Sequence, residues 1–200
     1  MKTLIILIIS LCLPIIQIIS QEEIFLKKSK VSDVIAFEKE AYPGVIFLDQ
    51  RSRLSKSFYP LADKYVTTEK PIIAYRHPLE YLPVYAEYYY TPEDSIIRLT
   101  SYEWEKDRFG NVFKKQDMYK EENKRFETYN KEYERIKLNL IDKLGKPTSS
   151  DTVARDEKGH NNVSLKTRDT VWETDDYYAS LDMIFGGQTF RIRLKHYWKN

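Results

Sequence analysis

The stretch TFRIRLKHYW, residues 189–198, alternates between two kinds of side chain. Phe, Ile, Leu, His and Trp occupy its even positions, and Arg, Arg, Lys and Tyr occupy the odd positions from 191 onward. Because successive side chains of a β-strand point to opposite faces, this alternation predicts a strand with one dry and one wet side. Such a strand belongs to an antiparallel sheet that packs a core on its dry side.

Four more runs upstream show β patterning. Residues 163–173 and 177–185 follow a polar loop expected at 148–162, and a Gly-Gly turn joins the second run to the last strand. This C-terminal part therefore predicts a three-stranded meander. A Thr-Pro-Glu-Asp-Ser turn separates two runs rich in aromatic and β-branched residues, 84–90 and 96–105, and so predicts a hairpin.

The strongest helical pattern lies between the hairpin and the meander. Apolar side chains recur at three- and four-residue steps from Phe126 to Leu144, which places them on one helical face. Gly145 and Pro147 then supply typical helix-stop chemistry. The order of elements predicts an α+β fold, a two-layer domain whose mainly antiparallel sheet (hairpin plus three-stranded meander) is covered by one long helix over about residues 115–144.

The N-terminal part of the expected domain, residues 21–83, contains five prolines and is less regular. A short helix is expected after Ser32, which suits a helix N-cap, and another over residues 54–65. Residues 45–48 and 71–75 are expected to be extended.

The first twenty residues have the pattern of a secretory signal. Lys2 supplies a positive start, residues 4–19 are almost entirely aliphatic, and Ser20 precedes polar residues. The apolar run is shorter than the roughly 20 residues that a spanning helix needs. We expect cleavage of residues 1–20, with the exact bond open, and export to the periplasm or the medium. The mature chain, 21–200, is then expected to be a single domain without a transmembrane segment.

Composition narrows the chemistry of the mature chain. The single cysteine, Cys12, lies inside the signal, so the mature chain offers neither a disulfide nor a thiol. The loss of Lys2 changes the formal net charge from +2 to +1, which gives no long-range field for nucleic acid. The 16 tyrosines suit β structure, and they also suit sugar or peptide binding.

The sequence contains no recognisable catalytic or cofactor motif. Its three histidines lack metal-ligand spacing, and nucleophile elbow, phosphate loop and dinucleotide fingerprint are missing, so we expect neither metal nor cofactor. A scattered hydrolase site would use His77, Glu103, Glu105 and His196. Two acids about 6–7 Å apart on one strand face suit glycoside hydrolysis, whereas the alternative is a wet strand face and a satisfied core histidine.

The best candidate binding surface is the wet side of residues 189–198. Five residues are expected to form it: Arg191, Arg193, Lys195, Tyr178 and Tyr197. Lys166 and Arg168 are expected to join it from two strands away. The combined charge predicts a site for an anionic polymer or an envelope component. The alternative is that basic residues keep a wet or edge strand from aggregating.

One motif links the helix to the meander. Leu144-Gly145-Lys146-Pro147 ends the helix, and the next strand carries Trp172 before two more strands. This pattern, over about residues 144–198, resembles small bacterial envelope-assembly lipoproteins. In that family a helix-plus-β-meander domain acts as a binding scaffold without catalysis. The family's lipoprotein cysteine is absent here, and the resemblance assigns no functional residue.

The sequence leaves three functions open. The lack of a catalytic motif favours a non-enzymatic exported binding or envelope-assembly module. The alternatives are an exported hydrolase built from scattered residues and an inhibitor- or immunity-like protein that binds another protein.

Asn162-Val163-Ser164 is a sequon for N-glycosylation, which matters only in a eukaryotic secretory pathway. The ligand and the oligomeric state stay open.

Overall fold

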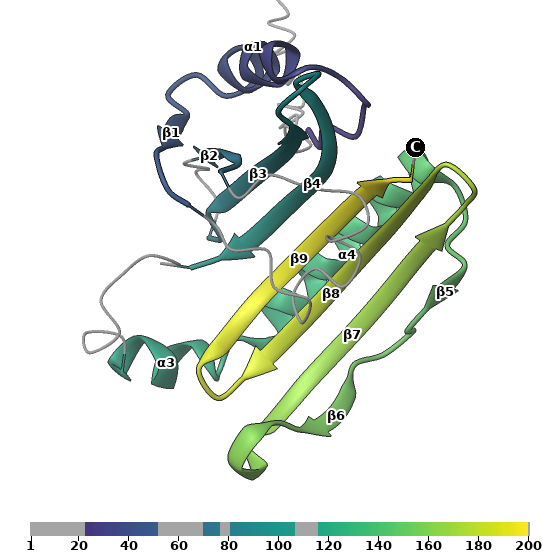
Figure 1. The fold of residues 1–200 in the computed structure, drawn as a ribbon. Coiled ribbons are helices and arrows are strands. Elements are labelled where there is room, and N and C mark those ends of the chain that lie inside the picture. The colour runs from purple at the N-terminus through teal and green to yellow at the C-terminus, as the bar shows by residue number, and fades with distance from the viewer. Residues whose placement is uncertain (1–22, 52–69, 77–80, 107–115, 200) are drawn as a thin grey trace, which may run out of the picture.

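The computed structural model describes residues 23–51, 70–76, 81–106 and 116–199 (Figure 1). Within these residues nine strands form one mainly antiparallel sheet in the order β1-β2-β3-β4-β9-β8-β7-β5, and β6 also pairs with β7. Helices α1 and α4 pack on the same face of this sheet. The predicted two-layer α+β fold is therefore confirmed.

The elements have the following bounds. The strands are β1 (Ile46–Leu48), β2 (Ile72–Arg76), β3 (Val84–Thr91), β4 (Ile96–Glu105), β5 (Ser149–Ser150), β6 (Arg155–Lys158), β7 (Ser164–Glu173), β8 (Tyr177–Gly186) and β9 (Thr189–Trp198). The helices are α1 (Val31–Ala41), α3 (Gln116–Glu122), α4 (Phe126–Leu144) and the 3₁₀ turn η2 (His160–Asn162).

The predicted hairpin and meander are present and share one sheet. The hairpin is β3–β4, and the meander is β7–β8–β9. They join through antiparallel pairing of β4 with β9, from Leu99 opposite Tyr197 to Glu105 opposite Arg191. The alternating stretch at residues 189–198 is thus a central strand, with neighbours on both sides.

The expected single helix over 115–144 is wrong, because two helices occupy that stretch. The Asn123 side-chain amide donates to the Tyr119 carbonyl at 2.8 Å, which takes up an acceptor at the end of α3. The backbone N–H groups of Lys124 and Arg125 then bond three residues back, at 3.1 and 2.9 Å, which breaks the α-helical ladder. Only α4 carries the apolar stripe.

The N-terminal part is more regular than expected, since β1 and β2 extend the same sheet beyond β3. The expected first helix is α1, which begins at Val31, one residue before the predicted cap. The helix expected over 54–65 and the signal expected over 1–20 lie outside the described residues. None of the described helices is long and apolar enough to cross a membrane.

The polar stretch at 148–162 was expected to be a loop, but it contains β5, β6 and η2. All four residues of β6, Arg155–Lys158, are exposed, and they pair with β7 along the edge of the sheet. A short, charged edge strand resists pairing with other chains. Sequence patterning does not predict β6, because a strand with both faces exposed to water has no alternation of apolar and polar residues.

The core lies between the sheet and the helices, on the side that we call the inner face. Buried α4 residues Tyr129, Tyr133, Ile136 and Leu140 belong to one apolar cluster with Leu181, Met183, Ile192 and Leu194 of β8 and β9. The end of α4 is tied to the sheet by Trp172, whose indole Nε1–H donates to the Gly145 carbonyl at 2.8 Å. Gly145 and Trp172, the two parts of the sequence motif that links the helix to the meander, are thus in direct contact.

Candidate functional site

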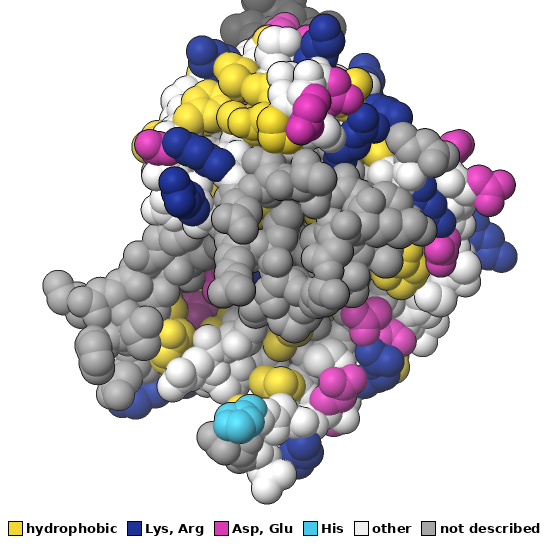
Figure 2. All heavy atoms as spheres, viewed as in Figure 1, with side chains coloured by type: hydrophobic (Ala, Val, Ile, Leu, Met, Phe, Trp, Pro, Cys, Tyr) yellow, Lys and Arg dark blue, Asp and Glu magenta, His cyan; other side chains and the backbone are white. Residues whose placement is uncertain are grey.

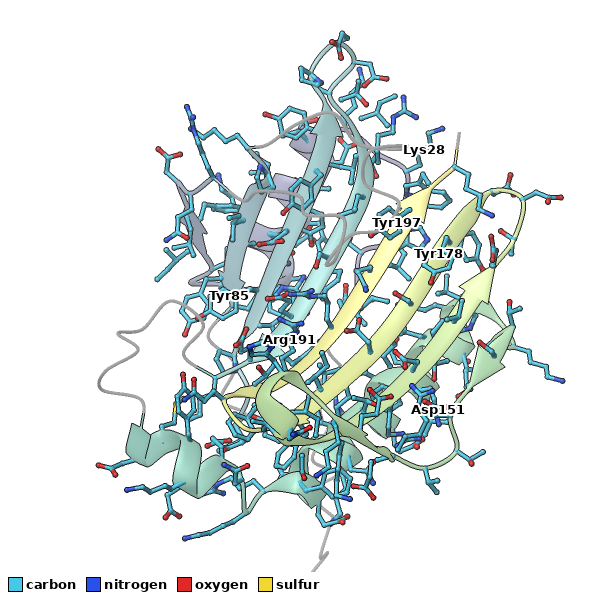
Figure 3. All side chains as sticks on the ribbon, turned by 60° about the horizontal axis from the view of Figure 1, so that its bottom comes forward. Lys28, Tyr85, Asp151, Tyr178, Arg191 and Tyr197 are labelled. Carbon is cyan, nitrogen blue, oxygen red and sulfur yellow. The ribbon has the colours of Figure 1, made fainter. Side chains whose placement is uncertain are left out.

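The five candidate binding residues lie along one face of β8 and β9, on the side opposite the helices, which we call the outer face. Arg191, Arg193, Lys195 and Tyr197 alternate with the inner-face residues of β9; Arg191 and Lys195 are half-buried, and Arg193 and Tyr197 are buried. Tyr178 of β8 lies directly opposite Tyr197, with ring centroids 6.0 Å apart. Figure 3 shows Arg191, Tyr178 and Tyr197 along these two strands.

The candidate catalytic residues do not converge. Glu103 and Glu105 lie on the outer face, opposite Arg193 and Arg191. His196 points to the inner face, as the alternation of β9 requires. His77 lies outside the described residues. The sheet itself therefore separates the histidine from both carboxylates.

Glu103 and Arg193 form a buried ion pair between β4 and β9. The Arg193 guanidinium donates to Oε1 of Glu103, and the two side chains are only 6% and 1% exposed. A buried charge keeps its charged form when a hydrogen-bonded partner offsets the loss of water. Glu103 is consequently committed to a structural pair rather than placed as a free acid or base.

Lys195 also has an acidic partner on the outer face. Its Nζ lies 3.3 Å from the Asp182 carboxylate, and both side chains are largely buried. Burial and then the neighbouring Arg193 lower the pKa of the Arg191 guanidinium, which lies opposite Glu105 of β4. Each β9 cation thus has a carboxylate on an adjacent strand.

A row of directly opposed residues crosses the outer face from β2 to β7. Its members are Tyr75, Tyr85, Glu103, Arg193, Asp182 and Asp169. The two tyrosine rings stack with centroids 4.7 Å apart. Burial and the adjacent Asp182 raise the pKa of Asp169, which the Arg155 guanidinium contacts. Sequence patterning could not find this row, since it depends on the register of every strand pair.

His196 is a core residue, as the simpler interpretation expects. Its ring is stacked on Tyr177 at 5.1 Å and meets the Trp198 ring edge-on at 4.6 Å. Neither ring nitrogen has a hydrogen-bond partner among the described residues. Burial lowers the pKa of His196 to about 4, so the imidazole is neutral at pH 7.

Lys166 and Arg168 lie on the inner face, so the expectation that they join the outer face is wrong. Arg168 is opposite Met183 of β8 and is almost fully buried. Its guanidinium donates to Asn130 Oδ1 at 2.8 Å and to Glu134 of α4. It therefore clamps the helix to β7. The sequence pattern of β7 does not show which of its residues share a face with Arg191, Arg193 and Lys195, because that depends on how β7 pairs with β8.

A second buried carboxylate, Glu122, was not predicted from the sequence. It accepts hydrogen bonds from the hydroxyls of Tyr81 and Tyr129 and from Lys106 Nζ, the last two at 3.1 and 3.3 Å. Burial and this carboxylate raise the pKa of Tyr129. The adjoining cavity, which Glu105 also lines, holds about 20 Å³. That volume suits about one water molecule, so the cluster joins elements rather than holding a substrate.

Two larger grooves lie at opposite ends of the described molecule. One, of about 530 Å³, lies between η2 and the β8–β9 turn. The other, of about 360 Å³, lies beside α1 and β1. Neither is lined by Glu103, Glu105 or His196. In the described ranges no group of three or more His, Cys, Asp or Glu side chains is placed to hold a metal ion.

Comparisons with protein-family models, with curated proteins and with solved structures found no match for this chain. Function is therefore inferred from the geometry of the residues themselves.

Proposed function

We propose that this chain is an exported, non-enzymatic binding module that takes an anionic polymer on the outer face of its sheet. One observation carries the proposal. The five candidate binding residues share one face of β8 and β9, whereas the candidate acids and His196 lie on opposite faces.

The charges of this face set the expected strength of binding. Residues two apart on a strand lie about 6–7 Å from one another, within a Debye length at physiological salt, so their potentials add. Glu103 and Asp182 lie against Arg193 and Lys195, and Glu105 lies opposite Arg191, so carboxylates offset part of the positive charge. Arg191 and Lys195 are half-buried and so can still meet a ligand, and Tyr178, half-buried near the Tyr197 end of the strand pair, offers it an apolar face. Weak, salt-sensitive binding is expected.

Binding to dextran sulfate at low ionic strength tests the proposal. Arg191→Gln is expected to weaken binding several-fold, and added salt is expected to weaken it further. Lys143→Gln is the matched control, because it removes one positive charge from an exposed position on α4. Arg193 is left intact, since its loss would strand the buried Glu103 carboxylate. Absence of wild-type binding at low salt would contradict the proposal.

Export is tested separately from binding. Mass spectrometry of the protein released by its host is expected to show an N-terminus near Gln21, because the signal-like segment ends at Ser20. A chain that keeps Met1 and stays in the membrane fraction would contradict cleavage.

A further inference from the structure

The end of the molecule formed by α1 and β1 presents an apolar groove to solvent. Ile35 of α1, Phe47 and Leu48 of β1, and Pro71 and Ile72 beside β2 line it. Phe47 is 36% exposed, and the adjacent Ile46 is 47% exposed. Figure 2 shows hydrophobic side chains gathered over α1 and β1 at the top of the molecule.

The opposite edge of the sheet is built differently. There β6 contributes Arg155, Asp156, Glu157 and Lys158, all exposed. Charged edges of this kind prevent unwanted pairing, whereas exposed apolar edges mark surfaces that contact something else. The contrast marks the α1–β1 end as a contact surface.

Basic residues surround the α1–β1 groove. Lys39 and Lys70 line it, and Lys70 Nζ lies 2.7 Å from the Asp49 carboxylate. Lys70, and then Arg51, hold the pKa of Asp49 below its usual value. Lys70 and Arg51 thus act on one carboxylate, and Lys39 adds a further cation to the groove lining, so this end carries more positive than negative side chains among these residues.

The chain also enters the fold at this end. The Glu23 backbone N–H donates to the Tyr42 hydroxyl at 2.7 Å, and Tyr42 directly follows α1. Arg76 donates to the Glu23 carbonyl at 3.0 Å, which fixes the segment further. The apolar run ends at Ile19, four residues before Glu23. Four extended residues span at most about 14 Å.

As long as the apolar run is joined to the folded domain and lies in a bilayer, that bilayer is within about 14 Å of Glu23. The end of the domain that carries α1 is then the end nearest the membrane. Its exposed apolar residues and its basic rim match the two components of an anionic lipid surface, acyl chains and phosphates.

We propose that the α1–β1 end docks on an anionic lipid bilayer. Ile46 and Phe47 enter the headgroup region, while Lys39, Arg51 and Lys70 lie beside the lipid phosphates. This surface is distinct from the outer face of β8 and β9. The proposal shares the export step with the proposed function but does not depend on polymer binding.

Co-sedimentation of the exported protein with lipid vesicles tests this docking. Vesicles of phosphatidylcholine with phosphatidylglycerol are expected to bind the protein, and vesicles of phosphatidylcholine alone are expected to bind it much less. Lys39→Gln is expected to weaken binding about fivefold, the usual effect of one cation near an anionic surface. Phe47→Ser and Ile46→Ser are each expected to weaken it as well, with melting temperatures showing that the variants fold.

Two controls locate the effect. Leu138→Ser removes an exposed apolar residue of α4, which is 62% exposed, and is expected to leave vesicle binding unchanged. Arg191→Gln is expected to weaken dextran sulfate binding without changing vesicle binding. Equal binding to both kinds of vesicle, or binding that folded Phe47→Ser and Ile46→Ser variants retain, would overturn the proposal. A lower oligomeric mass in the Phe47 variant, without wild-type vesicle binding, would also overturn it and indicate a second copy as the occupant.

Discussion

Helices α1 and α4 cover the same face of one sheet but are attached to it in different ways. α4 buries an apolar stripe, with Tyr129, Tyr133, Ile136 and Leu140 all inside the core. α1 buries only Val34 and Glu38 within its own length. The difference shows that one sheet can anchor one helix mainly by apolar area and another mainly by a buried charge.

The anchor of α1 is a polar network. Arg76 Nε donates to Glu38 Oε2 at 2.9 Å, and Arg76 Nη2 donates to Oε1 at 2.6 Å. The Tyr88 hydroxyl also donates to Glu38 and lies 2.7 Å from the Tyr102 hydroxyl. The Arg76 guanidinium lies 3.8 Å from the centre of the Tyr42 ring. Such a network holds the helix in one orientation but depends on every partner.

The largest effect is expected when the α1 network loses its carboxylate. Glu38→Ala leaves the Arg76 guanidinium buried without this partner, which typically costs about 3–5 kcal/mol of unfolding free energy. Glu40→Ala, at an exposed position of the same helix, is the control and is expected to change stability by less than about 0.5 kcal/mol. Urea unfolding measures both.

A double variant sharpens the same point. Replacing Glu38 and Arg76 together by Met removes both charges, and such replacements are often neutral or stabilising. We expect the double variant to be more stable than Glu38→Ala alone. A double variant as unstable as the single one would show that α1 is held by packing rather than by its charge pair.

The second prediction concerns the apolar anchor of α4. Leu140 is fully buried, so Leu140→Ala is expected to cost about 2–5 kcal/mol through lost contacts and a cavity. Leu138→Ala removes the same atoms from the exposed side of the helix and is expected to cost less than about 0.5 kcal/mol. A Leu140 cost as small as that of Leu138 would contradict the packing of α4 on the sheet.

Sequence patterning found the apolar anchor because its signal is local. Apolar residues recur at helical steps from Phe126 to Leu144, and apolar and polar residues alternate over 189–198. The buried face of each element can therefore be predicted from its own sequence. Glu38 and Arg76 are 38 positions apart and look like ordinary surface charges in the sequence. Nothing local distinguishes them from Glu40 or Lys39.

In the candidate site, too, local patterning predicts which residues share a face but not which residues contact them from other strands. Alternation alone placed Arg191, Arg193 and Lys195 on one face. The partners Glu103 and Asp182 depend on the registers of β4 and β8 against β9, which alternation does not give. The break between α3 and α4 lies where the backbone N–H groups of Lys124 and Arg125 bond three residues back, beside the Asn123 side-chain bond to Tyr119, and apolar spacing does not show it.

The third prediction concerns how the free energy of unfolding depends on pH when a buried ionisable group has, or lacks, a hydrogen-bond partner. The Glu38–Arg76 pair satisfies both charges, whereas the His196 ring has no hydrogen-bond partner in the described ranges. Burial lowers the pKa of His196 from 6.5 to about 4, so the unfolded chain binds the proton more readily between these values. Stability is therefore full above pH 6.5 and falls as the pH drops toward 4, by about 3 kcal/mol for this group.

Urea unfolding from pH 7 to pH 4 measures this loss. His196→Leu removes the titrating ring and is expected to flatten the pH dependence, whatever its own effect on stability at pH 7. Carboxylates such as Glu134, whose pKa is lowered beside Lys137 and Arg168 despite burial, titrate in both proteins, so the difference between the two curves isolates His196. Identical slopes would show that the histidine is not buried as a neutral ring.

The smallest expected effects come from single tyrosine hydroxyls, one under each helix. Tyr88 donates to the Glu38 carboxylate of the α1 anchor, and burial raises the pKa of this phenol. Tyr133 of α4 instead bonds to neutral groups, the Thr170 hydroxyl at 2.8 Å and the Leu181 carbonyl at 3.3 Å. Hydrogen bonds to charged groups contribute about 1.5–3 kcal/mol, and those between neutral groups about 0.5–1.5 kcal/mol.

Tyr88→Phe is therefore expected to cost more than Tyr133→Phe, although each removes one buried oxygen and keeps the ring. Because both changes keep the ring and its aromatic contacts, the difference between their costs compares a hydrogen bond to a charged group with hydrogen bonds to neutral groups. Without the Tyr88 hydroxyl, the Glu38 carboxylate keeps Arg76 as its partner among the described residues, and because Glu38 is fully buried, solvent does not replace the lost bond. Thr170 keeps a second contact with the Ser150 hydroxyl at 2.8 Å, which limits the loss at Tyr133. Equal costs in urea unfolding would mean that the two helices are held by similar bonds.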